Sequence, residues 1–417
     1  MKKVKIGILG YGTVGSAVDR LIQKNPSLGL EVKKICDISP KVKHPKLTRR
    51  ASDVINDPDI EVVVETIGGI NPAKKFVLAA LRAGKSVVTS NKELIALNLK
   101  ELAAAARRNK AALLFEAAVG GGIPILGPLM NDLSANRISE VFGIVNGTTN
   151  YILHKMTKEG MSFSEALARA KEKGYAEADP KKDIEGFDAS YKAAILAMVA
   201  FRAEISWKKV AFEGIARIEP EDIRYAQEIG YVIKLLAAAK MKGEEVEVSV
   251  HPTLIPCDHP LAFIPGPMNA IYVKGEPIGE LMFYGQGAGG GPTASAVVGD
   301  ILKIANAESL GFSRDKCLMP NLELRPIKMR DASEGMGQFY IRMLVPDRSG
   351  VLAKISKVFA NARVSIAVVN QRETVGKNAN LVIVTHEARQ ADLDRALARL
   401  KKLPVVRKVC NIIRVGL

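Results

Sequence analysis

The amino-acid sequence predicts an α/β protein that begins with a doubly wound parallel sheet and continues into two further folded regions. Three observations indicate this class. Short apolar strands alternate with helical patterns over residues 4–115, a glycine-rich turn follows the first strand, and an independent pattern of strands and helices begins at residue 338. Strands that alternate with helices are typical of a parallel sheet with helices on both faces.

The first domain opens with a strand, a glycine turn and a helix. Residues 4–9 are apolar, and apolar residues follow the glycines at helical spacing. A second strand ends at Asp37, and the pattern then predicts strands at 62–65, 86–89 and 112–115, with helices at 72–82 and 93–108. This domain is predicted to cover residues 1–131. A second glycine run at 285–292 opens a helix through residue 305, so the chain is predicted to return to the first domain over about 285–319.

The pattern changes from about residue 132 onward. Helical stretches at 164–173 and 187–201 stand among extended apolar pieces near 246–250 and 271–273, which predicts a mixed α+β domain over 132–284 that binds substrate and mediates dimerisation. Residues 320–337 are expected to form a linker. Residues 338–417 then show the order βαββαβ, with strands at 339–345, 364–369, 381–385 and 405–415 and helices at 351–359 and 391–400.

Composition limits the class of protein. A chain of 417 residues, 47% hydrophobic and 25% charged, can bury the cores of two or three domains. The apolar stretch 193–201 is far shorter than the roughly 20 residues that a membrane span needs, and the N-terminus does not resemble a signal peptide. We therefore expect a cytoplasmic protein without a membrane partner. Its four cysteines are far apart in the sequence and are expected to be reduced structural thiols: Cys36, Cys257, Cys317 and Cys410.

The basic charge is concentrated at the C-terminal end. The chain carries a net charge of +16, and residues 338–417 hold fifteen Lys and Arg against five Asp and Glu. A nucleic-acid surface is one interpretation, with Arg395, Arg399 and Lys402 along one side of a helix. A single-strand binder would interleave aromatic residues with these charges, and this pattern is missing. A solvated basic face is the better interpretation, and we predict no nucleic-acid partner.

The turn after the first strand has the form G-x-G-x-x-G. In such a turn the first glycine allows a tight bend, the second lets the backbone approach a pyrophosphate, and the third lets helix pack on strand. Gly10, Gly12 and Gly15 fit these positions, and Thr13 and Val14 lie between them. The strand before the turn and the amphipathic helix after it strengthen the motif, so we predict a dinucleotide cofactor at these five residues.

Residues after the next two strands extend the predicted cofactor site. A carboxylate at the end of the second strand can hold ribose hydroxyls, so Asp37 favours NAD. Four basic residues follow it and could instead neutralise the 2′-phosphate of NADP: Lys41, Lys43, Arg49 and Arg50. Both coenzymes therefore stay open. Thr66 directly follows the third strand and is also expected to contact the cofactor.

Two lysines are candidates for the chemistry. Lys92 comes just after the fourth strand, where ligands bind in open α/β sheets, although a lysine there is more often a surface residue. Asp188 and Lys192 are four residues apart on a predicted helix and share a face, so the acid can orient the ammonium and keep it charged. The alternative is an ordinary surface ion pair. A lysine can donate a proton or a fixed positive charge to the oxygen of an aldehyde as it is reduced.

The stretch 170–192 closely resembles the homoserine dehydrogenase signature. The A-x-x-x-G opening, the D-P, the D-I-x-G-x-D and the lysine four residues later all match. The resemblance implies an NAD(P)-dependent oxidoreductase that interconverts L-aspartate 4-semialdehyde and L-homoserine in threonine and methionine biosynthesis. It also implies that Lys192 is the general acid and base, that Lys92 assists, and that Glu177, Asp183 and Asp188 bind the substrate's ammonium and hydroxyl ends.

Other segments resemble the same family. Residues 116–124 match its E-A-x-V-G-G-G-I-P run, and residues 146–151 match N-G-T-x-N-[YF], a segment near its substrate site. By this resemblance a monovalent cation, Na⁺, would lie at Glu116, Val119, Gly121 and Ile123, although a buried glycine turn without an ion explains the run nearly as well. Gly287, in the second glycine run, would contact the cofactor.

The last eighty residues resemble an ACT domain. The segments 346–352 (P-D-R-S-G-V-L) and 385–388 carry this resemblance. In such domains the D-x-x-G turn at a helix start can capture the carboxylate of an amino acid, and threonine is the expected feedback ligand. The alternative is a dimerisation module that senses nothing. We expect a homodimer or a homotetramer.

A different dehydrogenase is the main rival. Aspartate semialdehyde dehydrogenase shares the metabolite and the glycine turn but needs a cysteine nucleophile, and neither Cys257 nor Cys317 has an evident base beside it in the sequence. The five histidines all lie outside the signature stretch, so lysine chemistry fits better.

Overall fold

The computed structural model describes residues 3–309, 322–331, 334–371 and 374–417. Parts of the predictions lie outside the described residues: 1–2 of the first domain, 310–319 of the return segment with Cys317, 320–321 and 332–333 of the linker, and 372–373 of the C-terminal domain. The chain forms two compact units. The first unit comprises Met1–Val141, Tyr191–Lys208 and Asn269–Ile327, and the second comprises Phe142–Ser190, Lys209–Met268 and Lys328–Leu417. The domain limits expected from the sequence stay a prediction.

A six-stranded parallel sheet organises the N-terminal part of the first unit. Its strand order is β3-β2-β1-β4-β5-β6 with parallel neighbours, so the order in which strands are added to the sheet reverses between β1 and β4. The predicted doubly wound, Rossmann-type sheet is confirmed. Ligands bind at the carboxyl ends of the strands beside such a reversal. The strands are β1 (Val4–Leu9), β2 (Leu30–Cys36), β3 (Leu47–Thr48), β4 (Val62–Glu65), β5 (Ser86–Thr89) and β6 (Leu113–Leu114).

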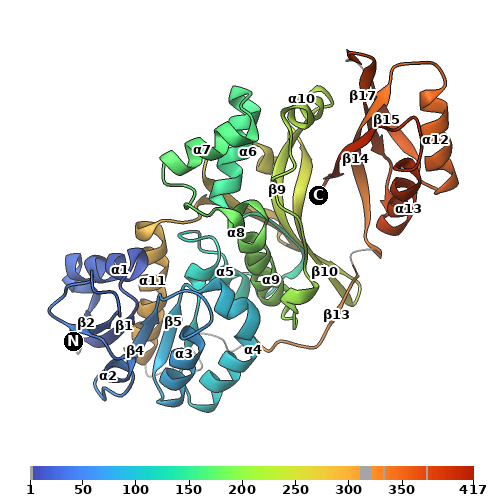
Figure 1. The fold of residues 1–417 in the computed structure, drawn as a ribbon. Helices are drawn as coiled ribbons and strands as arrows, with labels where there is room; N and C mark the ends of the chain where they lie inside the picture. The colour runs from blue at the N-terminus through green and yellow to red at the C-terminus, as the bar shows by residue number, and fades with distance from the viewer. Residues whose placement is uncertain (1–2, 310–321, 332–333, 372–373) are drawn as a thin grey trace. The chain divides into compact units, whose positions relative to one another are not determined.

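Helices cover this sheet. α1 (Thr13–Lys24) lies beside α11 (Gly290–Ser309), a helix from much later in the chain (Figure 1). Val18 of α1 and Ile301 of α11 enter one buried cluster with Ile6 and Ile8 of β1. Burying such side chains contributes about 1.5–3 kcal/mol each, which fixes the glycine turn between β1 and α1. The other helices here are α2 (Ala51–Ile55), α3 (Ala73–Arg82) and α4 (Lys92–Arg108).

The rest of the first unit carries a second sheet and a short helix. Strands β12 (Gly279–Gln286), β11 (Met268–Glu276) and β7 (Arg137–Ile144) are neighbours in that order, and α5 (Leu126–Met130) precedes β7 in the chain. α9 (Phe187–Phe201) has the bounds that the sequence predicts. Short 3₁₀ helices occur at Pro26–Leu28 and Glu116–Ala118 in this unit, at Trp207–Lys209 where the chain passes from the first unit to the second, and at Pro260–Phe263 in the second unit.

The second unit is built on a long antiparallel hairpin. β9 (Tyr231–Lys242) pairs with β10 (Glu245–Pro256) from Lys242↔Glu245 to Tyr231↔Pro256. β8 (Ala211–Phe212) and β13 (Lys328–Met329) each pair with β10 in parallel. The helices of this part are α6 (Gly147–Glu159), α7 (Phe163–Glu172), α8 (Lys181–Ile184) and α10 (Pro220–Glu228).

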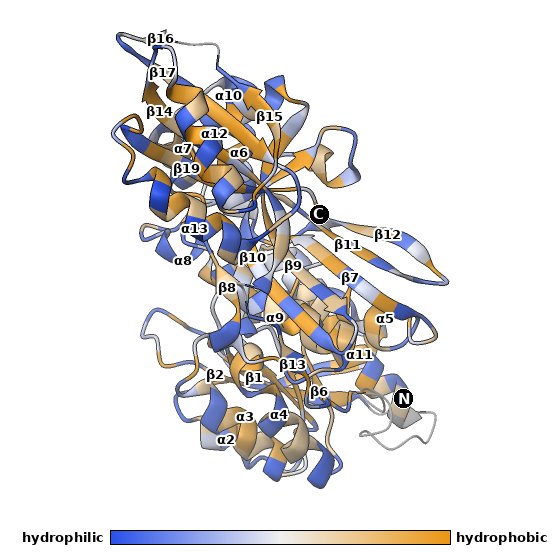
Figure 2. Cartoon of the chain, turned by 90° about the vertical axis from the view of Figure 1, so that its right-hand side faces the viewer, coloured by the Kyte–Doolittle hydropathy of each residue, from blue (hydrophilic) through white to orange (hydrophobic). Residues whose placement is uncertain are grey.

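The C-terminal residues form the predicted βαββαβ domain. Its sheet order is β19-β14-β17-β15 with antiparallel neighbours, and two short strands, β16 and β18, add to the prediction. Figure 2 shows β14, β15 and β17 largely in the hydrophobic colour. Buried side chains of β14 and β17, together with the partly buried Ile366 of β15, pack with those of both helices. The elements are β14 (Met336–Pro346), α12 (Val351–Asn361), β15 (Ile366–Asn370), β16 (Thr374–Val375), β17 (Asn378–Thr385), β18 (Ala388–Arg389), α13 (Gln390–Leu400) and β19 (Lys408–Val415).

A buried polar cluster around Asp222 joins this domain to α10. Asp222 is fully buried and accepts hydrogen bonds from Arg342 Nε at 2.6 Å, Asn411 Nδ2 at 2.8 Å and the Tyr340 hydroxyl at 3.2 Å. Arg342 also pairs with Glu219. The hydrogen bonds to Asp222 raise the pKa of Arg342 against the opposing effect of burial, so the guanidinium stays charged. We call these five residues the Asp222 cluster.

Within the described ranges, no helix is both long and apolar enough to cross a bilayer.

Candidate active site and coenzyme-binding turn

The three glycines of the turn differ in what a side chain would meet. Gly10 has φ +93°, and a Cβ there would lie 2.8 Å from the carbonyl oxygen of Thr66. A Cβ on Gly15 would lie 2.1 Å from the carbonyl oxygen of Gly10. Gly12, which caps the N-terminus of α1, faces open space. Packing therefore requires glycine at 10 and 15, whereas position 12 leaves room for an anionic group at the helix N-terminus, where Thr13 and Val14 begin α1.

Thr66 and Asp37 hold the turn from two sides. The Thr66 hydroxyl donates to the carbonyl of Gly10 at 2.8 Å. Asp37 accepts from the backbone N–H of Tyr11 at 2.6 Å through one oxygen and from that of Ser39 at 2.7 Å through the other. The Asp37 carboxylate thus lies at the glycine turn and shapes the loop that follows β2.

The basic residues after Asp37 fall into two groups. Arg49 donates to the carbonyls of Asp37 and Ser39, each at 2.7 Å, and Arg50 pairs with Asp53 at 3.2 Å. Both guanidinium groups are therefore engaged within the loop. Lys41 and Lys43 are exposed.

The carboxyl ends of β4 and β5 carry further polar groups. Lys92 is half-buried and is the first residue of α4, which Asn91 caps by accepting from Leu94 N–H at 3.0 Å. Glu65 ends β4, is fully buried, and accepts from the Thr89 hydroxyl at 2.5 Å and from Ile67 N–H at 2.7 Å. Burial raises the pKa of Glu65. Glu65 was not among the site residues predicted from the sequence. A carboxylate that ends an otherwise apolar strand could have indicated it.

The segment 116–123 is the predicted cation site. Both carboxylate oxygens of Glu116 already accept backbone N–H groups, from Ile125, Leu126 and Gly127, each at 2.7 Å. The Lys303 ammonium lies 3.7 Å from the same carboxylate. The donor set that fits a monovalent cation is therefore the backbone carbonyls of this turn, the type of hard oxygen ligand that such an ion prefers.

Two glycine turns approach each other closely at the same segment. A Cβ on Gly121 would lie 2.5 Å from the backbone of Gly287, and a Cβ on Gly287 would lie 1.8 Å from the Asn269 side chain. Gly122 N–H donates to the carbonyl of Gln286 at 3.1 Å. Only glycine permits this contact, so the two predicted sites, one for a cation and one for the cofactor, are neighbours in the first unit.

In the second unit, an amide connects two of the predicted substrate residues. Asn146 Nδ2 donates to Asp183 Oδ1 at 2.7 Å and to Asp188 Oδ2 at 3.0 Å. The Thr148 hydroxyl lies 3.2 Å from Asp183 Oδ2 and 2.5 Å from the carbonyl of Tyr175. Among the described residues, the contacts of this group do not include Glu177, which is exposed in the loop before α8. The sequence marked Asn146 and Thr148 only as members of the 146–151 motif. The structure adds their contacts with the two carboxylates.

α9 carries both the acid and the lysine of the signature. Asp188 and Lys192 are one helical turn apart and almost fully buried, with 6% and 8% of their surfaces exposed. A surface ion pair would be solvated, and these two residues are not. In a region of low polarisability, charge–charge and charge–dipole interactions are several times stronger than in water.

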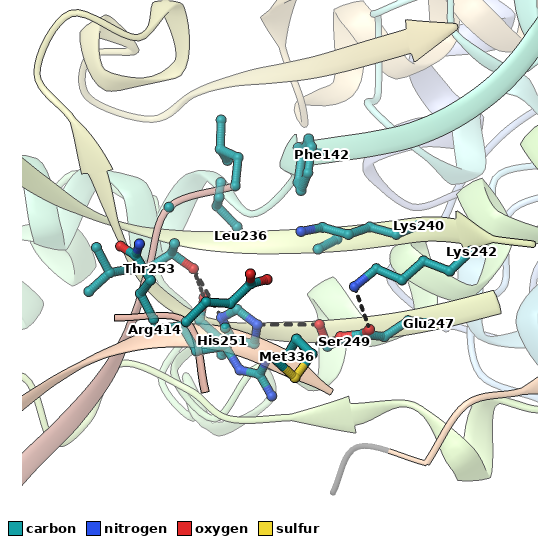
Figure 3. A pocket seen from close by; sticks show the side chains of 17 residues that line it. Phe142, Leu236, Lys240, Lys242, Glu247, Ser249, His251, Thr253, Met336 and Arg414 are labelled. Atoms are coloured by element: carbon teal, nitrogen blue, oxygen red, sulfur yellow. Dashed lines mark hydrogen bonds and ion pairs between the residues drawn. The ribbon is translucent and has the colours of Figure 1, made fainter. Parts of the chain in front are cut away.

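A separate polar cavity of about 290 Å³ lies in the second unit (Figure 3). His251 lies between Ser249, 3.3 Å from Nε2, and Thr253, 3.0 Å from Nδ1, and Arg414 and Glu247 also line the cavity. Burial lowers the pKa of His251 well below its usual value, so this imidazole is neutral. No predicted catalytic or coenzyme residue lines this cavity.

Comparisons with protein families, with related sequences and with solved structures agree on one family along the chain. Three family models match: "Homoserine dehydrogenase, NAD binding domain" over 10–116, "Homoserine dehydrogenase" over 124–302 and "ACT domain" over 339–405. The homoserine dehydrogenase of Bacillus subtilis is 42% identical over 430 residues, covering 100% of this chain and 99% of that relative. The crystal structure of a homoserine dehydrogenase from Thiobacillus denitrificans has a TM-score of 0.94 at 36% identity, covering 100% of this chain and 98% of the other.

A further solved structure bears on the coenzyme. A hyperthermophilic archaeal homoserine dehydrogenase in complex with NADPH has a TM-score of 0.63 at 30% identity, covering 74% of this chain and 98% of the other. The NAD-binding domain and the ACT domain expected from the sequence are confirmed. Because relatives above 40% identity align with the whole length of the chain, it belongs to the homoserine dehydrogenase family.

Proposed function

We propose that the chain interconverts L-aspartate 4-semialdehyde and L-homoserine through Lys192, as a step of threonine and methionine biosynthesis. The observation that carries the assignment of Lys192 is its burial on α9, one turn from the equally buried Asp188. The bound coenzyme supplies or accepts the hydride at the carbonyl carbon. Lys192 donates a proton to the aldehyde oxygen during reduction and takes it back from the hydroxyl of homoserine during oxidation.

The remaining polar residues bind and orient the substrate in this proposal. Asp188 keeps the Lys192 ammonium charged and correctly directed, since an adjacent carboxylate favours the protonated form. Asp183 and Glu177 receive the substrate's ammonium group, and Lys92 assists at the oxygen. Holding both reacting groups at fixed distances replaces a bimolecular encounter with an oriented one.

The coenzyme site is proposed at the glycine turn. Gly12, at the start of α1, would hold the pyrophosphate, and Thr66 and Gly287 would complete the contacts. Two features of the loop after β2 oppose each other, because the Asp37 carboxylate repels a 2′-phosphate while Lys41 and Lys43 attract it. The ratio of kcat/KM with NADPH to that with NADH, measured before and after Asp37→Ser, gives the balance between them. A rise in this ratio supports the role of Asp37 at the ribose.

A monovalent cation is proposed at the carbonyls of Glu116, Val119, Gly121 and Ile123. With its carboxylate engaged by three N–H groups, Glu116 would contribute its carbonyl. Activity and thermal stability compared in Na⁺ and in a bulky organic cation test this site.

We propose that the C-terminal domain binds threonine at the turn between β14 and α12. Gly350 caps α12 with φ +81°, and Asp347 precedes it in the exposed D-x-x-G turn, so N–H groups at the helix start are available to a carboxylate. Threonine should then inhibit the enzyme.

We also propose a homodimer or homotetramer that works in the cytoplasm. The edge strand β12 exposes Met282 and Tyr284, and Ile278 is exposed in the turn before it. An exposed apolar edge is a usual place for association. Light scattering after size-exclusion chromatography, with Met282→Lys as the disrupting variant, measures the oligomeric state.

The decisive experiment follows the absorbance of the reduced nicotinamide with aspartate semialdehyde as substrate. Lys192→Ala should lower kcat by on the order of 10²-fold or more and leave coenzyme affinity unchanged. Lys181→Ala, at a largely exposed lysine on α8, is the matched control and should keep full activity. Near-normal turnover of Lys192→Ala would remove Lys192 from the mechanism.

A further inference from the structure

Asn146 is the N-cap of α6, and the oxygen and the nitrogen of its side-chain amide make different contacts. Its oxygen accepts from Thr149 N–H at 2.9 Å and lies 3.0 Å from the Thr149 hydroxyl. This is the usual capping interaction, which satisfies a backbone donor of the first helical turn. The residue is almost fully buried.

The nitrogen of the same amide lies between two carboxylates. It is within 3.0 Å of an oxygen of Asp183 in α8 and of an oxygen of Asp188 in the first turn of α9. An amide NH₂ has two hydrogens, so one hydrogen serves each carboxylate. Two carboxylates this close repel each other and favour the uptake of a proton by one of them. The shared donor offsets that repulsion without adding a charge.

The first turn of α6 rests on a firm support. A Cβ on Gly147 would lie 2.6 Å from the carbonyl oxygen of Pro267, so the helix start packs directly against the 264–268 segment. Asn150 donates to the carbonyls of Gly266 at 2.8 Å and Met268 at 3.1 Å, and Lys234 donates to Asn150 at 2.9 Å. Asn146 therefore projects its amide from a rigid base.

We infer that Asn146 is a positioning residue for substrate binding: its amide holds Asp183 and Asp188 at a fixed separation, both ionised, so that they receive the ammonium and hydroxyl ends of the substrate. The inference rests on the proposed roles of Asp183 and Asp188. Asn146 acts through these two carboxylates and through the orientation that Asp188 gives to Lys192.

The substitution Asn146→Asp separates this role from capping. Asp caps a helix as well as Asn does, so a capping role alone predicts no change. The positioning role predicts that KM for aspartate semialdehyde rises by on the order of tenfold or more, because the shared donor is replaced by a third carboxylate. Coenzyme affinity should stay unchanged, since the coenzyme turn lies in the other unit.

The pH profile gives a second readout that a structural role would not move. Asn146 contacts the carboxylates of Asp183 of α8 and Asp188 of α9, and Lys192 lies one turn further along α9. Three neighbouring carboxylates take up protons at higher pH than two. The acid limb of kcat/KM against pH should therefore move to higher pH in Asn146→Asp. Asn146→Ser keeps a capping oxygen without adding charge, so it should raise KM and leave the limb in place.

Two further variants make every outcome decisive. Ser162→Asp places a carboxylate at the half-buried N-cap of α7 and should leave both readouts unchanged. If Asp188→Asn leaves KM unchanged, the proposed role of the carboxylates fails, and the inference fails with it. If Asp188→Asn raises KM while Asn146→Asp and Asn146→Ser keep KM within twofold of wild type, only the inference is overturned. Should Asn146→Asp not fold, Asn146→Ser decides by its KM.

Discussion

Replacing Arg342 with methionine should destabilise the packing of α10 against the C-terminal domain. Methionine matches the aliphatic part of the arginine side chain and removes the guanidinium group, with its charge and the Nε and Nη2 donors. Arg342 has 3% of its side chain exposed, and its partner Asp222 is fully buried. Removing one member of a buried pair leaves the other charge uncompensated, which typically costs 3–5 kcal/mol.

The structure sets where in this range the cost falls. Asp222 keeps the hydrogen bonds from Asn411 at 2.8 Å and from the Tyr340 hydroxyl at 3.2 Å after Arg342 is lost. These donors partly compensate the carboxylate, so we expect the low end, about 3 kcal/mol. At about 1.4 kcal/mol for each factor of ten, the local opening equilibrium rises by on the order of 10²-fold.

Hydrogen–deuterium exchange of the amides in β14 measures this opening directly. Exchange should accelerate by on the order of 10²-fold in Arg342→Met if β14 opens locally. Arg395→Met is the matched control, because Arg395 pairs with Asp392 on the exposed side of α13 and should matter little. Adding Asp222→Asn to Arg342→Met should restore part of the loss. Acceleration of less than about fivefold in Arg342→Met would refute the assigned energetic role of the cluster.

Three further outcomes are expected. Gly12→Val should fold normally, because position 12 faces open space, yet coenzyme binding by fluorescence titration should weaken at least tenfold; unchanged binding would contradict the proposed pyrophosphate position. Burial raises the pKa of Asp300 from 3.8 to about 6, so this acid contributes stability that is complete below about pH 4 and is lost as pH rises through about 6. The loss should be on the order of 2–3 kcal/mol by urea unfolding and should be reduced in Asp300→Asn, and an equal pH dependence in both proteins would exclude Asp300 as its source. Gly350→Ala strains a backbone with φ +81°, so threonine should inhibit the variant less while its activity without threonine stays unchanged; full inhibition would move the effector site away from this turn.

Local signals were sufficient for the elements that carry the chemistry. The glycine turn, the strands before Thr66 and Lys92, and the helix over 187–201 follow from glycine spacing and apolar runs, because β4, β5 and α9 are buried almost throughout. β9 was missed for the opposite reason. Its residues 234–242 read K-L-L-A-A-A-K-M-K, a run of good helix formers, yet they form a strand whose middle is buried on both faces. The pairing with β10 overrides local propensity there.

Contacts between residues that are far apart in the sequence limit how much of the site can be predicted. The sequence marks 146–151 and 170–192 as separate motifs, but periodicity cannot reveal that one amide nitrogen of Asn146 meets both Asp183 and Asp188. Glu116 shows the same limit. Its resemblance suggested an ion ligand, whereas the fold supplies its carboxylate with three backbone N–H partners that lie at the start of α5.

The pairing of β19 with β10 gives the C-terminal domain a mechanical connection to the rest of the second unit. Thr253 pairs with Arg414 and Leu254 with Val415, so the two parts share a ladder of backbone hydrogen bonds as well as the connecting chain. A ligand that displaces β19 must pull on β10 or break this ladder, because the backbone of a strand transmits tension with little stretch. Deleting residues 338–417 would also leave this edge of β10 without its partner strand, so the shortened protein should tend to associate edge to edge.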